Sequence, residues 1–447
     1  MRRRLTPALA CVAVARRPSD PAGAGLKARP YIRTQLNRSF SRVSVAVAAI
    51  TVTLCNPPLR AQSASNDRAR EMGISALIGG RPGEVDAITD VKGVEVGQTT
   101  LIEGEGRLVV GKGPVRTGVT VVHPRGKSNP DPVFGAWFTL NGNGEMTGTT
   151  WLEESGTLEG PVAITNTHSV GIVRDAILQW QVSRPGLQPW GLPVVAETYD
   201  GGLNDINGFH VKPAHVLSAL DGATAGKVAE GNVGGGTGMR CLGFKGGIGT
   251  ASRVLSPDTG GYTVGVLVQC NFGARQDLRV AGVPVGEEIT DLRPCIALDD
   301  ANVQPRMARC GRDQAVSREP EREQGSIIVI VATDAPVLPH QLKRLATRVA
   351  LGVGRTGGFG GNSSGDIFLA FSTANAKSAG AEDVQRVEML PNARMNALFY
   401  GTVQATEEAI LNAMLAATTM TGADGLRVYA LPHDRLLAAL RNYGRLK

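Results

Sequence analysis

Short apolar runs bounded by glycine recur from Arg68 to the end of the chain, and this pattern most limits the folds open to it. Glycine accounts for 57 of the 447 residues without a collagen-like period, so it marks many tight turns and not a fibre. Apolar runs of strand length stand at residues 117–124, 161–167, 262–273, 326–336 and 367–373. The sequence therefore predicts sheets built from short strands.

Helical segments separate some of these strands, but without a regular strand–helix alternation. Helices are expected at residues 169–180, 211–220, 340–353, 393–418 and 433–443. A doubly wound parallel sheet requires strands and helices to alternate along the chain. We therefore expect an α+β fold in which sheets and helices pack in layers.

The positive charge of the chain belongs to its beginning. Residues 1–62 hold eleven of the 47 basic residues and one of the 40 acidic residues, so the remainder carries a net charge of −3 against +7 for the whole chain. Nucleic-acid binding needs a basic face on the folded domain. The charge distribution therefore argues against nucleic acid as a partner.

Residues 1–62 read as a leader that contains a signal peptide. Residues 33–42 form a positive segment, residues 43–55 form a short apolar segment, and small residues near Ala61 to Ala64 suit a signal peptidase. The apolar segment is too short to span a membrane comfortably, and no run of 18 apolar residues follows it. We expect an exported protein, periplasmic or secreted, with no stable membrane anchor and a single domain over residues 63–447.

Four cysteines lie outside the leader, with no C-x-x-C spacing and therefore no zinc ribbon. Cys295 and Cys310 either pair or remain free thiols, and both lie in the polar stretch 286–325, which we expect to be a surface loop. The six histidines show no metal-binding spacing, so no metal site is predicted.

Polar and glycine residues crowd the segment 139–156, between two apolar runs. It is either a pair of exposed turns or a loop that presents amides and carboxylates to a substrate amine. The binding alternative selects Asn143, Glu153 and Glu154, with His168 as a further candidate. GNSSG at 361–365 matches G-x-S-x-G, but a helix precedes it and a strand follows, which is the reverse of a nucleophile elbow.

Several long motifs, in order and spacing, resemble the DmpA/BapA group of self-processing aminopeptidases. They are DAITDVKGVEVGQTTL, LNGNGEMTG, EESG, ITNTHSVGIVRDA, ETYDGGLNDINGFHV, GNVGGGTGM, FKGGIGTASRVL, GVLVQCNFG and ATDAP followed by LPHQLKRLA. The resemblance implies a layered αββα sandwich of the DmpA type and no metal or organic cofactor. It implies aminopeptidase activity on short peptides, amides or esters, and a homo-oligomer of processed protomers.

The resemblance also implies site residues and a self-cleaved precursor. The cut is expected after Gly273, giving an α part of residues 63–273 and a β part of residues 274–447. The residue after the cut would be the N-terminal nucleophile, and here it is Ala274. By the same resemblance Asn232 supplies an amide to the oxyanion, and Asp334 orients the nucleophile.

Alanine has no hydroxyl, so Ala274 can neither cleave the precursor nor attack a substrate. Three hypotheses follow: a non-catalytic pseudoenzyme that still binds peptides or amines, a nucleophile variant of an active enzyme, or an enzyme whose nucleophile is elsewhere. For the last, Thr250 is the candidate, because it also follows a glycine.

Overall fold

The structure is a computed structural model, and it describes residues 68–184, 190–298, 308–311 and 325–447. The predicted leader, its signal peptide and its cleavage site lie outside these residues. In the described part of the chain, no helix combines the length and the apolar character needed to cross a membrane.

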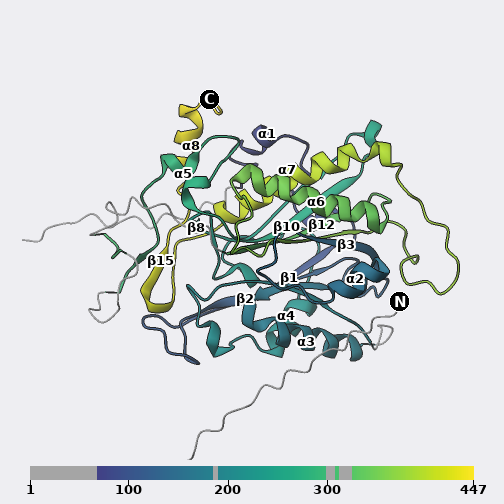
Figure 1. The fold of residues 1–447 in the computed structure, drawn as a ribbon, viewed down its shortest axis with the longest axis horizontal. Helices are drawn as coiled ribbons and strands as arrows, with labels where there is room; N and C mark the ends of the chain where they lie inside the picture. Colours follow the sequence, from purple (N-terminus) through teal and green to yellow (C-terminus); the bar gives the residue numbers. More distant parts are fainter. Residues whose placement is uncertain (1–67, 185–189, 299–307, 312–324) are drawn as a thin grey trace, which may run out of the picture. The chain divides into compact units, whose positions relative to one another are not determined.

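The first layer pair is a four-stranded sheet with two helices on its outer face (Figure 1). The helices are α3 (Val170–Val182) and α4 (Pro213–Asp221). Their apolar faces and the outer face of the sheet share one buried cluster, which includes Val121, Val173 and Val216. The strands, in spatial order, are β1 (Glu95–Glu103), β2 (Val115–His123), β5 (Val162–Asn166) and β6 (Val194–Thr198).

The second layer pair is a six-stranded sheet covered by α6 (Pro339–Thr356) and α7 (Asn396–Leu415). Strand β12 lies at its centre and runs antiparallel to β10 but parallel to β13. The strands, in spatial order, are β4 (Thr157–Leu158), β3 (Val133–Thr139), β13 (Ile367–Ser372), β12 (Ser326–Thr333), β10 (Thr263–Asn271) and β9 (Gly247–Val254).

The alternation of side chains along β12 shows how the two sheets meet. Ile328 and Ile330 belong to a buried cluster that also contains Ile164 of the four-stranded sheet. Ile327 and Val329 point the other way, into the cluster shared with α6 and α7. The result is four layers in the order helix, sheet, sheet, helix, so the predicted α+β fold and its αββα layering are confirmed.

Smaller elements flank the two sheets. A three-stranded sheet joins β11 (Cys295–Ile296), β15 (Leu426–Val428) and β14 (Met420–Thr421). The remaining elements are α1 (Ser75–Ile78), α2 (Thr149–Ser155), the paired β7 (Arg240–Cys241) and β8 (Phe244–Lys245), α5 (Val285–Glu288) and α8 (His433–Asn442).

In the stretch 286–325, predicted to be one surface loop, several of the described residues pack against the domain. The stretch contributes the end of α5 and all of β11, and Ile289 and Cys295 are buried. Cys295 and Cys310 form a disulfide with an S–S distance of 2.01 Å, which decides between the two alternatives left open by the sequence. A second disulfide, which the sequence did not predict, joins Cys241 to Cys270.

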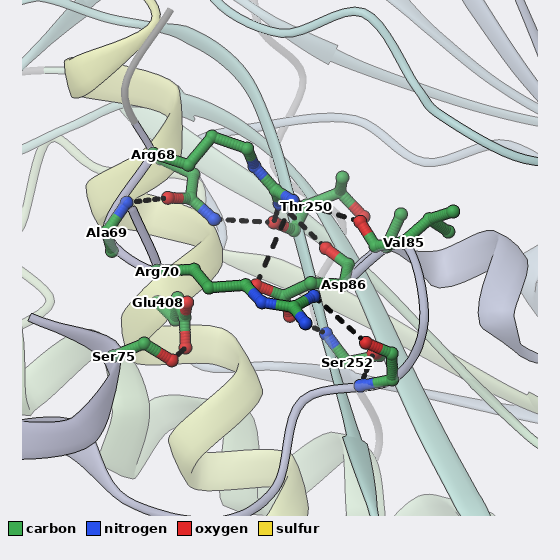
Figure 2. A network of polar contacts seen from close by, with 12 residues as sticks. Arg68, Ala69, Arg70, Ser75, Val85, Asp86, Thr250, Ser252 and Glu408 are labelled. Carbon is green, nitrogen blue, oxygen red and sulfur yellow. Dashed lines mark hydrogen bonds and ion pairs between the residues drawn. The ribbon is translucent and has the colours of Figure 1, made fainter. Parts of the chain in front are cut away.

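The first described residues form an arm that is fastened to β9 and α7 (Figure 2). The Arg68 guanidinium donates to the backbone oxygens of Asp86 and Thr250, each at 2.7 Å, and its Nε lies 2.7 Å from Oε2 of the buried Glu230. The Ala69 amide donates to the side chain of Asn412 on α7. The arm is therefore held by a partly buried ion pair and by backbone groups of the sheet edge.

We expect Arg68→Met to lower the free energy of unfolding by about 3 kcal/mol, because it leaves Glu230 as a buried carboxylate without its partner. Arg70→Met is the matched control, because Arg70 is exposed and donates to the backbone oxygens of Gly83 and Glu84. It should change the free energy by about 0.5 kcal/mol or less. Urea unfolding of both variants measures the difference, and equal losses would contradict the assigned role of Arg68.

Candidate active site

A hydroxyl that follows a glycine stands at the first position of β12. Ser326 shares the face of the strand that bears Ile328 and Ile330, so its side chain is directed into the space between the two sheets. Its backbone pairs with Asn271, the last residue of β10. Gly325 has φ +101°, and a Cβ there would lie 1.8 Å from the backbone oxygen of Asn271, so only glycine fits.

The loop before β13 reaches the Ser326 hydroxyl from one side. The Gly365 amide donates to Ser326 Oγ at 3.1 Å, and Ser364 bridges Gly325 through the backbone. The Ser364 hydroxyl donates to Asp366 Oδ1 at 2.5 Å, and the Ile327 amide donates to the same oxygen at 3.2 Å. Asp366 therefore binds Ser364, on the loop before β13, and Ile327, the residue after Ser326.

Asp366 is buried, and this burial raises the pKa of its carboxyl above the ordinary value. The hydrogen bonds from Ser364, from Asn141 and from the Ile327 amide act in the opposite direction and favour the charged form. A carboxylate that accepts these bonds can hold the loop in place and can polarise the Ser364 hydroxyl beside Ser326.

On the β10 side, the Asn271 amide lies against Gly325. Its Nδ2 would be 3.1 Å from a Cβ at Gly325, and it donates to the Tyr199 backbone oxygen at 3.0 Å. Its Oδ1 accepts from the Arg240 amide at 2.8 Å. The side chain is thus fixed at both ends, with its nitrogen beside the peptide that precedes Ser326.

The four-stranded sheet contributes a buried carboxylate to the same region. Glu197 at the end of β6 accepts from the Glu145 amide at 3.0 Å and from the Thr167 hydroxyl. A Cβ at Gly144 would lie 3.1 Å from Gly365 Cα and 3.4 Å from Glu197 Oε1, so this loop connects Glu197 to the Ser326 side. Burial raises the pKa of Glu197, and the bond from Thr167 opposes that rise.

Of the residues that the sequence assigned to substrate binding, some lie near Ser326 and others lie away from it. Asn143 lies at the site, because its amide nitrogen donates to the Ser363 backbone oxygen and its backbone amide donates to Ser364. His168 stacks on Phe209 with ring centroids 5.8 Å apart, and its position near Glu197 opposes the rise in the pKa of that carboxyl. Both therefore remain candidates for a pocket wall.

Glu153 and Glu154 are exposed on α2, away from these contacts. Glu153 forms an ion pair with Lys343 of α6 at 2.6 Å. This part of the segment is therefore an exposed helix and not one of the expected turns, and among the described residues the ion pair of Glu153 leads to α6 and not to Ser326.

The structure does not bring Ala274, Gly273 and Asp334 together, contrary to the expectation from the resemblance. Ala274 is fully buried at the start of a short 3-10 helix, just beyond the end of β10. Asp334 accepts from the Thr263 amide at 2.7 Å, at the opposite end of β10. Because β10 and β12 are antiparallel, a full strand length separates the two positions.

The side chains of Asn232 and Thr250 form hydrogen bonds with residues outside the Ser326 region. The Asn232 amide nitrogen donates to the backbone oxygen and the hydroxyl of Thr418. Thr250 borders a cavity of about 650 Å³, but its hydroxyl donates to the Val266 backbone oxygen at 2.6 Å and accepts from the Ile88 amide. Its own carbonyl accepts from Arg68 and Asn412 (Figure 2). Thr250 is thus locked within a strand.

Comparison with known proteins identifies the family. The sequence model of Peptidase family S58 matches residues 86–428 of this chain. The chain belongs to peptidase family S58. This S58 peptidase is 56% identical over 390 residues to the beta-peptidyl aminopeptidase BapA of Sphingosinicella microcystinivorans, covering 86% of this chain and 95% of that one. It is 45% identical over 415 residues to BapA of Sphingosinicella xenopeptidilytica, covering 91% and 98%.

Solved structures agree. A beta-aminopeptidase from Burkholderia sp. superposes with a TM-score of 0.72 at 47% identity, over 85% of this chain and all of that one. The L-aminopeptidase D-Ala-esterase/amidase of Ochrobactrum anthropi, a variant of the Ntn hydrolase fold, gives 0.73 at 46% identity, over 85% and 99%. The S58 peptidase is therefore an aminopeptidase and a hydrolase of the N-terminal-nucleophile type, which confirms the resemblance.

Sequence reasoning did not select Ser326, Asn271, Ser364 or Asp366. A signal for Ser326 was present, because a glycine–serine pair stands where the polar stretch 286–325 meets a strongly apolar strand. The other three become visible only once β10, β12 and β13 are placed side by side. In the described part of the chain, no cluster of three or more His, Cys, Asp or Glu side chains is placed to hold a metal ion.

We expect Asp366→Asn to slow peptide hydrolysis by about 10² or more, because the carboxylate that orders Ser364 and the Ile327 amide is lost. Asp334→Asn is the matched comparison, since Asp334 also accepts a backbone amide but at the other end of β12. Steady-state kinetics on a β-alanyl anilide measures both. The geometry predicts a change within about twofold for Asp334→Asn, and the reverse ranking would restore Asp334 to the site.

Proposed function

We propose that the chain is an exported, self-processing aminopeptidase that cuts the Gly325–Ser326 bond and then uses Ser326 as its N-terminal nucleophile. The observation that carries this proposal is the Ser326 hydroxyl itself, at the start of β12, between a donor amide from Gly365 and the Asn271 side chain. This assignment replaces Ala274 and the cut after Gly273, and it gives an α part that ends at Gly325 and a β part of residues 326–447.

In the proposed self-cleavage, Ser326 Oγ attacks the carbonyl carbon of Gly325 while its proton leaves to a neighbouring acceptor. The oxygen of that carbonyl takes the negative charge, and Asn271 Nδ2, which lies against Gly325, is placed to donate to it. The C–N bond breaks, the amine of Ser326 is protonated and an ester remains. Water then hydrolyses the ester, which frees the Gly325 carboxylate and the Ser326 hydroxyl.

The same groups serve substrate turnover. The freed α-amine of Ser326 has an ordinary pKa near 8, so about a tenth of it is neutral at pH 7 and about half at pH 8, and the neutral form takes the hydroxyl proton as general base. Oγ attacks the carbonyl of the substrate's N-terminal residue, the remaining peptide leaves with a proton, and water releases the acyl group. Asn271 stabilises the oxyanion in both half-reactions, in place of Asn232.

The substrate's own amino group requires an anionic or carbonyl-lined pocket near Ser326. Glu197 reaches this region from the end of β6, and Asn143 and Glu145 reach it from the loop that follows β3. The relatives' name, beta-peptidyl aminopeptidase, supports short peptides and amides with an N-terminal β-residue as substrates. His168 on Phe209 would bound the pocket.

Two further features belong to the proposal. The leader at residues 1–62 supports export to the periplasm or beyond, and the resemblance to self-processing aminopeptidases supports a homo-oligomer of processed protomers. A non-catalytic protein that binds peptides in the same site is the alternative function. The reason for this alternative was that Ala274 occupies the expected nucleophile position. The Ser326 hydroxyl, which accepts a hydrogen bond from the Gly365 amide, argues against it.

Intact-mass measurement tests the proposal. We expect the purified protein to give two chains, one of which begins at Ser326, and Ser326→Ala to give a single chain without aminopeptidase activity. Ala274→Ser is the matched variant and should be processed as the original chain is, because residue 274 is buried beyond the end of β10. Normal processing and activity of Ser326→Ala would contradict the proposal, and an intact, inactive original chain would favour the pseudoenzyme.

A further inference from the structure

Lys245 is a fully buried lysine that has no assigned role in the reaction described above. It lies on β8, and its Nζ donates to the backbone oxygens of Met239 and Gly246 at 2.8 Å each, with Gly236 O at 3.5 Å. Among the described residues, it forms no ion pair with a carboxylate. Burial is the cause that lowers its pKa, to about 7. A buried cation without a counter-ion is costly, since most buried charges are paired.

The peptide group between Met239 and Arg240 connects this ammonium to the proposed oxyanion site. Its carbonyl accepts from Lys245 Nζ at 2.8 Å, and its N–H, on Arg240, donates to Asn271 Oδ1 at 2.8 Å. The other end of the Asn271 amide lies beside Gly325. One peptide plane therefore separates the buried Lys245 Nζ from the amide that faces the scissile bond.

Hydrogen bonds in such a chain polarise one another. A cation at the carbonyl oxygen withdraws electron density from the peptide, so the N–H becomes a stronger donor. The stronger bond at Asn271 Oδ1 in turn makes Nδ2 a better donor to a developing oxyanion. The same contact also fixes the rotation of the side chain, because Oδ1 has a preferred partner.

We propose that Lys245 is a positioning residue for the oxyanion site, and that its ammonium fixes and polarises the Met239–Arg240 peptide, which holds the Asn271 amide toward the reacting carbonyl. The inference rests on the proposed function, because it requires Asn271 to serve the oxyanion. It makes a charged group outside the substrate pocket contribute to self-cleavage and to peptide hydrolysis alike.

A double-mutant cycle tests the inference. Losing an oxyanion donor outright costs about 10²–10³ in kcat, so Lys245→Met, which weakens the donor indirectly, should lower kcat about 10- to 100-fold with KM within about twofold. In an Asn271→Ala background, the same substitution should change kcat by less than about threefold, because the group through which Lys245 acts is gone. The rate of self-cleavage should fall in parallel with kcat.

Arg275→Met is the matched control. Arg275 is also a fully buried cation, and it donates to the backbone oxygens of Gly243, Ile289, Asp291 and Leu292, whose peptides do not bond to Asn271 among the described residues. Its effect on kcat per folded molecule should be small and should be the same with and without Asn271. If Lys245→Met does not fold, Lys245→Gln removes the charge while keeping a donor, and it should show the same coupling.

The outcomes separate the two claims. Equal effects of Lys245→Met with and without Asn271, or a kcat like that of Arg275→Met, would overturn the role of Lys245 and leave the proposed function intact. An Asn271→Ala enzyme with undiminished kcat, or an active Ser326→Ala enzyme, would instead overturn the proposed function on which the inference rests.

Discussion

The close approach of Gly325 to Asn271 at the start of β12 is the contact on which the site depends. The two backbones are so near that a Cβ at Gly325 would lie 1.8 Å from the Asn271 oxygen. This contact ends the pairing of β10 and β12 at Ser326 and sets the hydroxyl at the rim of the space between the sheets. The Asn271 amide reaches the preceding peptide only because the strands end together.

The layered fold supplies two supports for that contact. The apolar inner face of β12 anchors the strand from the second position onward, through Ile328 and Ile330. The parallel neighbour β13 carries Ser364 and Asp366 just before its first residue, so the loop that holds the Ser326 hydroxyl begins at the same sheet edge. The polar site can therefore be rigid, because the apolar side chains of the same strands are packed in the core between the two sheets.

Much of the fold could be predicted from the sequence, because apolar periodicity survives folding. The helices expected at 169–180 and 340–353 are α3 and the main part of α6, and the strand expected at 326–336 contains β12. The site could not be predicted in the same way. The resemblance assigned Asp334 to a nucleophile that follows Gly273, whereas antiparallel pairing places Asp334 beside Thr263 and Ser326 beside Asn271.

Polar contacts that depend on how turns and strands are arranged in space were missed for the same reason. The role of Lys245 depends on a turn that returns Met239 to its Nζ, and no local pattern indicates that contact.

The most direct test of the central claim is peptide mapping of the processed enzyme after reaction with a serine-directed sulfonyl fluoride. We expect one modified residue, Ser326, at the N-terminus of the smaller chain. Inactivation with the label on Thr250 or Ser363, and none on Ser326, would contradict it.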